Sequence, residues 1–411
     1  MRQYGWGVII ILLVLLSPTV ANAQRSDVPE YGQRGAYAVG TFEFTIDDDT
    51  NNRPLNGTIW YPADAIAGAE PEVSYNIALI FGVQGFAYRD AQPNLADGPY
   101  PLIVYTHGSF GSRVYSLWLT EHLASQGFIV MAVDHPDNSL ATNLTRPQNQ
   151  ARSFALRTNE ISRQLDYAEL LNASGTMAGM FDLENIGVTG YSLGAVNTLE
   201  IAGARLNFDR LETFCDEQTT PSEENVCQTR SYASQIASMR GLQHMPSGNW
   251  ASQADPRVDA IAIYAPWNGV GIDVSTVNVP TFIAVGTNDD VAIPERDAYN
   301  IFDNLTTTRY MTSLELGGHV LFVDECAPVH DVYEIWDACT DPVWDLERAH
   351  DILNHATTAF FLTHLTGQTE AEDILINYDA VGVEVAYQSE RSPLSTILRA
   401  SKSAIRESTI E

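Results

Sequence analysis

The chain has 411 residues, of which 45% are hydrophobic, so it can bury a full core and is neither disordered nor collagen-like. Its 52 acidic residues outnumber 22 basic ones and give a formal net charge of -30. Phosphate backbones and anionic lipid surfaces repel so anionic a protein, which excludes electrostatic binding to nucleic acids or membranes. We therefore expect no nucleic-acid partner.

The first 23 residues have the pattern of a secretory signal peptide. Arg2 precedes the apolar run Val8–Leu16, which is too short to span a bilayer, and Ala21-Asn22-Ala23 has the small-x-small pattern of a cleavage site. The sequence thus predicts a mature chain that starts at Gln24, is secreted to the periplasm or the medium, and has no stable membrane insertion after cleavage.

Apolar runs and helical stretches alternate along the mature chain. Ala36–Ile46 and Leu55–Tyr61 flank a polar turn and predict a hairpin. Short β-branched runs, which are typical of parallel strands buried on both faces, lie at 102–106, 129–133, 186–189, 260–264 and 281–285. One more strand is expected at Tyr310–Leu316. Amphipathic stretches predict helices at 117–125, 152–171, 194–204 and 295–305. This alternation predicts an α/β protein with a mostly parallel central sheet flanked by helices.

Two segments do not follow this alternation of strands and helices. Residues 207–253 are polar and predict an insertion between core elements, either a lid or a surface decoration. Residues 367–411 predict a polar C-terminal tail without a role in the core. The core domain would then span residues 24–366.

The four cysteines are expected to form disulfides in an exported protein. The simplest pairing joins Cys215 to Cys227 and Cys326 to Cys339, although four cysteines allow three connectivities. A zinc site is the alternative, but the chain has no C-x-x-C pair and its spacings do not match those of zinc fingers. We therefore expect two disulfides and no metal.

A candidate catalytic motif is the G-x-S-x-G pentapeptide Gly190-Tyr191-Ser192-Leu193-Gly194. It follows an expected strand and opens a helical pattern, which is the context in which such a serine acts as a nucleophile. A side chain at either flanking glycine would collide with the neighbouring strand or helix. Ser192 is therefore predicted to be a catalytic nucleophile and not a helix-capping serine.

A serine hydroxyl needs a base and an orienting acid. The strand expected at 281–285 leads into two carboxylates at the carboxyl end of the sheet, of which we choose Asp289 and keep Asp290 as the alternative. One strand later, Gly317-Gly318 precede His319 in a flexible loop. Of the nine histidines, His319 alone has this placement, so it is the predicted base.

Backbone N–H groups are needed to hold the developing oxyanion. Leu193, which follows the nucleophile, supplies one of them. The loop after the strand at 102–106 supplies another, with the N–H of Ser109 preferred to that of Phe110. Gly108 lets this backbone approach the substrate, and we expect His107 to shape the loop.

Several stretches resemble known families. GPYPLIVYTHGSFGSR from Gly98 and LASQGFIVMAVDHPDN from Leu123 resemble secreted α/β-hydrolases of the platelet-activating-factor acetylhydrolase and dienelactone-hydrolase-like group. Ala265-Pro266-Trp267 and VPTFIAVGTNDD resemble segments of cutinase-like polyester hydrolases, including those acting on polyethylene terephthalate. The resemblance covers about residues 35–205 and 257–366. It implies an α/β-hydrolase fold in which Trp267 stacks on substrate, and Phe110 is similarly placed to line the site.

Together these features predict a secreted serine carboxylic ester hydrolase that acts through a Ser-His-Asp triad and an acyl-enzyme, without a metal or an organic cofactor. Its partner is an ester, with polyesters and short-acyl lipid esters as candidate substrates. The insertion at 207–253 has no counterpart in compact polyester hydrolases and could exclude a polymer. The alternatives are a catalytically inactive hydrolase-fold binding module and a hydrolase of another bond type, such as a peptidase or a carbon-carbon hydrolase.

Overall fold

The computed structural model describes residues 27–47, 53–65, 69–78, 81–143, 149–217, 221–324 and 340–389. Within these residues, ten strands form one sheet in the order β14-β13-β12-β10-β8-β6-β7-β2-β1-β5. Its centre, from β13 to β7, is parallel, whereas β14 and β2 join antiparallel at its two ends. The predicted α/β class and mostly parallel sheet are confirmed.

The strands of this sheet are β1 (Ala38–Ile46), β2 (Leu55–Ala63), β5 (Tyr88–Arg89), β6 (Tyr100–Thr106), β7 (Ile129–Val133), β8 (Phe181–Tyr191), β10 (Ala260–Tyr264), β12 (Thr281–Gly286), β13 (Arg309–Leu314) and β14 (Val383–Gln388). Two small sheets pair β3 (Val73–Ala78) with β4 (Phe81–Gly85) and β9 (Arg205–Leu206) with β11 (Ile272–Asp273). The expected hairpin is β1 and β2. The expected parallel strands are present with shifted ends, since β8 begins at Phe181 and not at Ile186.

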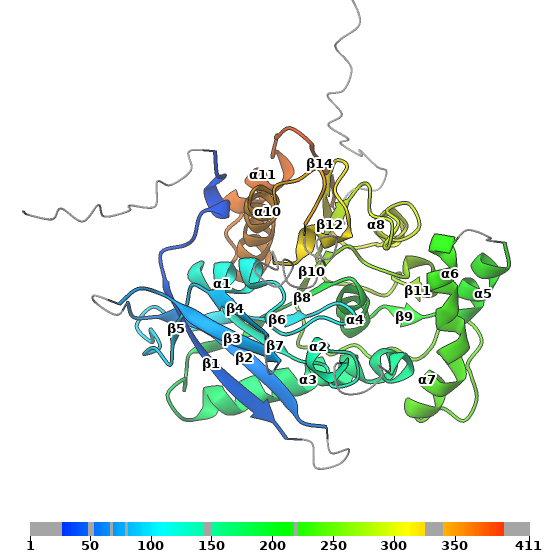
Figure 1. The fold of residues 1–411 in the computed structure, drawn as a ribbon, viewed down its shortest axis with the longest axis horizontal. Helices are drawn as coiled ribbons and strands as arrows, with labels where there is room; N and C mark the ends of the chain where they lie inside the picture. Colours follow the sequence, from blue (N-terminus) through cyan, green and yellow to red (C-terminus); the bar gives the residue numbers. More distant parts are fainter. Residues whose placement is uncertain are drawn as a thin grey trace, which may run out of the picture.

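Helices cover both faces of the sheet (Figure 1). They are α1 (Leu117–Ser125), α2 (Leu140–Asn143), α3 (Gln150–Ala173), α4 (Leu193–Ile201), α5 (Phe208–Glu217), α6 (Pro221–Cys227), α7 (Ala233–Met239), α8 (Ala298–Asn304), α10 (Leu346–Thr366) and α11 (Glu370–Ile376). The core accordingly has two layers. Leu102 and Val104 of β6 belong to the layer of α3 and α4, while Ile103 and Tyr105 belong to that of α1 and α10. Alternate residues of a strand point to opposite faces and both faces are covered, so β6 is buried throughout.

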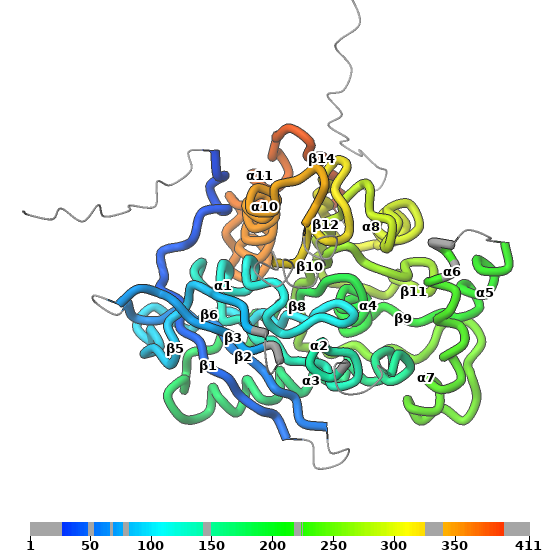
Figure 2. The backbone as a smooth tube through the Cα atoms, in the orientation of Figure 1, coloured from blue at the N-terminus to red at the C-terminus, as the bar shows by residue number. Residues whose placement is uncertain are grey.

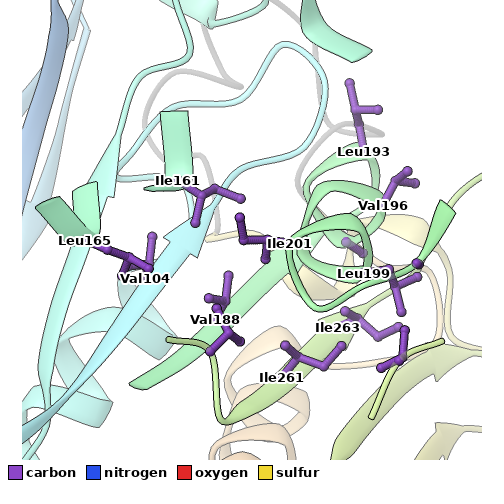
Figure 3. Close-up of a cluster of buried hydrophobic side chains, with 14 of the residues drawn as sticks. Val104, Ile161, Leu165, Val188, Leu193, Val196, Leu199, Ile201, Ile261 and Ile263 are labelled. Carbon is purple, nitrogen blue, oxygen red and sulfur yellow. The ribbon is translucent and has the colours of Figure 1, made fainter. Parts of the chain in front are cut away.

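Helix α4 is packed tightly onto the middle of the sheet. Figure 3 shows its apolar side chains beside those of β8 and β10, with Ile161 and Leu165 of α3 and Val104 of β6 completing the cluster. Leu193, Val196, Leu199 and Ile201 of α4 are each at most 1% exposed. This packing fixes the turn between β8 and α4 against a rigid layer.

The segment predicted to be an insertion contains α5, α6 and α7, which stand together at one side of the sheet (Figure 1). It is fastened to the core by Arg240, which donates to Phe154 O and to Glu200 Oε1, both at 2.7 Å. The structure pairs Cys215 with Cys227, as predicted, and so joins α5 to α6. Cys326 and Cys339 lie outside the described residues.

The prediction that residues 367–411 form a polar tail without a role in the core is wrong for α11 and β14. The backbone path in Figure 2 returns to the sheet, where β14 pairs with β13, and α11 buries Ala371 and Leu375. β14 is an edge strand of 6 residues, held by backbone hydrogen bonds on one side only, and so short a segment gives little sequence signal. Residues 390–411 and the predicted signal peptide lie outside the described residues. No helix in the described part of the chain has the length and apolar character needed to cross a bilayer.

Candidate active site

Ser192 sits at a sharp turn between β8 and α4. Its φ of 55° and ψ of -117° lie in a region that residues with side chains rarely adopt. A Cβ atom on Gly190 would lie 2.5 Å from Gly194 O, and one on Gly194 would lie 2.1 Å from Thr106 O. Both glycines are therefore required by close backbone contacts, as the sequence pattern indicates.

The close contact at Gly194 gives a first prediction. Gly194→Ala is expected to lower the free energy of unfolding by about 2 to 3 kcal/mol, because the new methyl group would press on the backbone of β6. Chemical denaturation followed by circular dichroism measures the loss. Gly82→Ala in the β3–β4 hairpin is the control, because its nearest atoms lie 3.2 Å away. Equal losses in the two variants would contradict this explanation of the turn.

The structure brings together the three residues predicted to act as nucleophile, base and acid. Ser192 Oγ lies 3.1 Å from His319 Nε2, and His319 Nδ1 lies 2.7 Å from Asp289 Oδ2. The residues follow β8, β13 and β12, respectively, so they meet where parallel strands present their carboxyl ends. His319 opens a 3-10 helix, η4 (His319–Phe322), and its side chain is 13% exposed. Asp290 is exposed and makes no such contact among the described hydrogen bonds.

The Asp289 carboxylate is held in one orientation. Its Oδ1 accepts the backbone N–H groups of Val291 and Ala292 at 2.9 and 2.8 Å, which leaves Oδ2 for the His319 ring. The carboxylate side chain is fully buried. The imidazole is therefore oriented with Nδ1 toward the acid and Nε2 toward Ser192.

Tyr191 is a site residue that the sequence reasoning did not single out. Its hydroxyl donates to the backbone carbonyl of His319 at 3.0 Å, and its ring centroid lies 5.0 Å from that of His319. Burial raises the pKa of Tyr191 well above 10, which keeps the hydroxyl protonated as a donor. The only signal available was its position beside Ser192 in the pentapeptide.

The loop after β6 places backbone N–H groups beside Ser192. A Cβ atom on Gly108 would lie 2.9 Å from the Tyr191 ring and 3.2 Å from Ser192 Cβ, so glycine lets the loop approach. The N–H of Phe110 donates to Asn138 Oδ1 at 2.9 Å. Among the described residues, the N–H groups of Ser109 and Leu193 have no intramolecular acceptor. These two N–H groups are thus free to bind an oxyanion.

A pocket of about 240 Å³ opens at Ser192. Its lining consists of Ser109, Phe110, Gln150, Phe154, Ser192, Leu193, Asn225, Gln228, Thr229, Tyr232, Trp267 and Val291. Among the described residues, none of these side chains is charged, in a protein whose net charge is -30. Asn225 comes from α6, and Gln228, Thr229 and Tyr232 come from the 3-10 helix η2 (Gln228–Tyr232), so the insertion forms one wall of the pocket.

Phe110 and Trp267, both predicted to bind substrate, line this pocket. Phe110 is 48% exposed and has a φ of 60°, which turns its side chain out of the loop. Trp267 is half-buried, with its ring centroid 6.2 Å from that of Phe154. Both rings therefore lie where a bound ester could contact them.

Asp297 anchors the loop that carries Trp267. Its Oδ1 accepts the N–H of Gly269 at 2.7 Å, and its Oδ2 accepts from Arg296 Nε at 3.0 Å. The Asp297 side chain is fully buried, and this burial raises the pKa of the carboxyl to about 6 in spite of the opposing effect of Arg296. The native protein therefore binds this proton more tightly than the unfolded chain, in which an Asp has a pKa near 3.9.

This raised pKa predicts how stability depends on pH. The contribution of Asp297 is fully present below about pH 4 and is lost as the pH rises through 6, a decrease of about 2 to 3 kcal/mol. Asp297→Asn should remove this part of the dependence, as measured by urea unfolding of both proteins between pH 4 and pH 7. The exposed Asp290→Asn is the control and should follow the wild type. Identical pH profiles for Asp297→Asn and the wild type would contradict the prediction.

The chain is similar to ester hydrolases over part of its length. Residues 73–172 match the family model of platelet-activating factor acetylhydrolase, isoform II. Cutinase est2 of Thermobifida alba is 31% identical over 133 residues, which are 32% of this chain and 40% of the cutinase. Cutinase 2 of Thermobifida cellulosilytica is 29% identical over 147 residues, 35% of this chain and 51% of the cutinase. The bis(hydroxyethyl) terephthalate hydrolase of Streptomyces coelicolor is 32% identical over 110 residues, 27% of this chain and 31% of that enzyme.

The sheet topology, the turn at Ser192 and these similarities define an α/β-hydrolase fold. The predicted fold and the predicted resemblance to the acetylhydrolase and cutinase groups are confirmed. The chain spans about two fifths to half the length of the cutinases that it matches.

Proposed function

We propose that this protein is a secreted serine carboxylic ester hydrolase. The main support for the proposal is a pair of contacts, 3.1 Å between Ser192 and His319 and 2.7 Å between His319 and Asp289. A serine at this turn, bonded to an imidazole that a buried carboxylate orients, is the arrangement that activates a hydroxyl for attack on a carbonyl carbon.

The mechanism follows from the orientation of these groups. His319 Nε2 takes the Oγ proton while Ser192 attacks the ester carbonyl, and the oxyanion forms against the N–H groups of Ser109 and Leu193. Collapse of this intermediate expels the alcohol, which receives the proton from His319, and leaves an acyl-enzyme. Water then loses a proton to His319 and attacks the acyl carbon. The bond from this carbon to Ser192 Oγ breaks, His319 returns the proton to Oγ, and the carboxylic acid is released.

The pocket supports neutral esters as substrates. Its described lining presents uncharged amides and hydroxyls beside four aromatic rings and offers no counter-ion for a charged acyl group. The similarity to cutinases and to a bis(hydroxyethyl) terephthalate hydrolase supports polyesters and their aryl fragments as candidates, and the acetylhydrolase match supports short-acyl lipid esters. The wall formed by the insertion favours small esters over polymer chains.

A hydrolysis panel tests this proposal. The purified protein is assayed on p-nitrophenyl acetate, butyrate and palmitate, on short-acyl phospholipids, on bis(hydroxyethyl) terephthalate and on polyester film. We expect hydrolysis of the short neutral esters. Activity on none of these esters would overturn the proposed function, and activity on film equal to that on soluble esters would overturn the preference for small substrates.

Trp267→Ala tests the role of the aromatic wall. We expect KM for bis(hydroxyethyl) terephthalate to rise about fivefold, because stacking of two aromatic rings contributes about 1 kcal/mol, with little change for ethyl butyrate. Phe86→Ala is the control, since Phe86 is an exposed aromatic residue outside this pocket. An unchanged KM for the aryl ester would contradict the stacking role.

We also propose that residues 1–23 direct export. The pairing of Cys215 with Cys227 supports an oxidising destination. Intact mass of the secreted protein is expected to correspond to a chain that starts at Gln24, and a mass that retains residues 1–23 would contradict the cleavage.

A further inference from the structure

Asn138 connects the loop after β7 to the loop that carries the proposed oxyanion donor. Its Oδ1 accepts the N–H of Phe110 at 2.9 Å, and its Nδ2 donates to Ser109 Oγ at 3.2 Å and to Gln150 Oε1 at 3.3 Å. The Asn138 side chain is fully buried. One amide therefore binds both residues whose N–H groups could face the substrate.

These contacts decide which N–H is available. Phe110 has a φ of 60°, an unfavourable conformation for a residue with a side chain, and its N–H is directed to Asn138. The preceding N–H, that of Ser109, has no acceptor among the described residues, and Ser109 lines the pocket together with Ser192. Loss of the Asn138 amide would free Phe110 to relax and would move the Ser109 N–H.

The backbone of Asn138 is held by a buried cation, the guanidinium of Arg157. Arg157 donates through Nη1 to His107 O at 2.8 Å and through Nη2 to Asn138 O at 3.0 Å, so one guanidinium joins the two loops. The N–H of Asn138 donates to His135 O at 3.1 Å. Arg157 is 1% exposed, and burial lowers its pKa to about 10, which still leaves it charged at neutral pH. The backbone of Asn138 is thus fixed, and its side chain holds Ser109 and Phe110 in place through its hydrogen bonds.

The ring of His107 braces the start of the same loop. His107 Nε2 accepts the N–H of His135 at 3.1 Å, so the ring proton lies on Nδ1 and donates to Gly108 O at 2.7 Å. Burial lowers the pKa of His107 well below 6.5, which keeps this ring neutral. Both sides of Ser109 are therefore constrained, by His107 before it and by Asn138 after it.

We infer that Asn138 is a positioning residue of the oxyanion hole, which withdraws the Phe110 N–H and holds the Ser109 N–H toward the reacting carbonyl. This inference rests on the proposed function. Because the donor acts on the charge that develops in the transition state, loss of Asn138 should reduce kcat and leave KM nearly unchanged.

The test compares Asn138→Ala with the wild type on p-nitrophenyl butyrate. We expect kcat to fall about 10- to 100-fold with KM within about twofold, since complete removal of one such donor costs about 10²- to 10³-fold. A trifluoromethyl ketone, which forms a hemiketal with Ser192 Oγ, should bind more weakly by the same factor. Hydrogen exchange at the Phe110 amide should become faster. Asn138→Ser, which keeps a polar group but does not reach this amide, should behave in the same way and replaces the alanine variant if that one does not fold.

Asn172→Ala is the matched control. Asn172 Oδ1 also accepts a backbone N–H, that of Phe181, at 3.0 Å, but at the opposite end of β8 from Ser192. This variant should keep the kcat and the ketone affinity of the wild type. Folded Asn138 variants that retain kcat within about twofold, or that lose activity through KM alone, would overturn the inference but leave the ester hydrolase intact. If the Ser192→Ala variant hydrolysed the ester as fast as the wild type, both this inference and the proposed function would be overturned.

Discussion

Replacing Ser192 with alanine is expected to lower kcat for ester hydrolysis by about 10⁵- to 10⁶-fold while the protein remains folded. The hydroxyl is the atom that would bond covalently to the acyl group, so its loss removes the route through an acyl-enzyme. The backbone turn, its flanking glycines and the N–H groups of Ser109 and Leu193 are unaltered by this change. Steady-state hydrolysis of p-nitrophenyl butyrate measures the loss, with circular dichroism to verify folding.

The control for this variant is another buried serine. Ser125 Oγ donates to His122 O at 2.6 Å and accepts the N–H of Gly35 at 2.9 Å, and Ser125 does not line the pocket. Ser125→Ala should reduce stability and leave kcat within about twofold of the wild type. If Ser192→Ala retained substantial activity, Ser192 would not be the nucleophile.

Asp289→Asn is the second change with a large expected effect, a decrease in kcat of about 10⁴-fold. The amide oxygen would stay with the N–H groups of Val291 and Ala292, because an amide NH₂ cannot accept hydrogen bonds. The NH₂ would then face His319 Nδ1, so this nitrogen would have to be the acceptor and the ring proton would move to Nε2. His319 would present a donor to Ser192 and could not take its proton.

The neighbouring Asp290→Asn variant is the matched control for this change. Asp290 is exposed beside the same turn, so its loss should leave kcat within about twofold of the wild type. The pH dependence of kcat would be recorded for both variants. An Asp289→Asn enzyme as active as Asp290→Asn would show that the His319 tautomer is not set by Asp289.

The fold was predictable where a periodic pattern exists. The parallel strands are continuous apolar runs because both faces of the sheet are covered, and Ser192 stands out because its flanking glycines have no room for a side chain. By contrast, β14 is a short edge strand whose pairing with β13 depends on backbone groups, which every sequence has.

The site was predictable only in part for similar reasons. Asp289 and Asp290 are adjacent, and only the backbone turn that offers the N–H groups of Val291 and Ala292 to Asp289 distinguishes them. The position of Tyr232 in the pocket wall depends on how the insertion docks onto the core, which has no sequence signal. Asn138 acts through a loop without periodicity, so its role could be found only from its contacts.

The most direct test of Ser192 as the nucleophile is covalent labelling with a fluorophosphonate, followed by peptide mass spectrometry. We expect one phosphonyl group on the peptide that contains Ser192, loss of esterase activity in proportion to labelling, and no label on the Ser192→Ala protein. A protein that hydrolyses esters at its full rate after Ser192 is completely labelled, or one in which inhibition follows a label on another residue, would contradict the proposed mechanism.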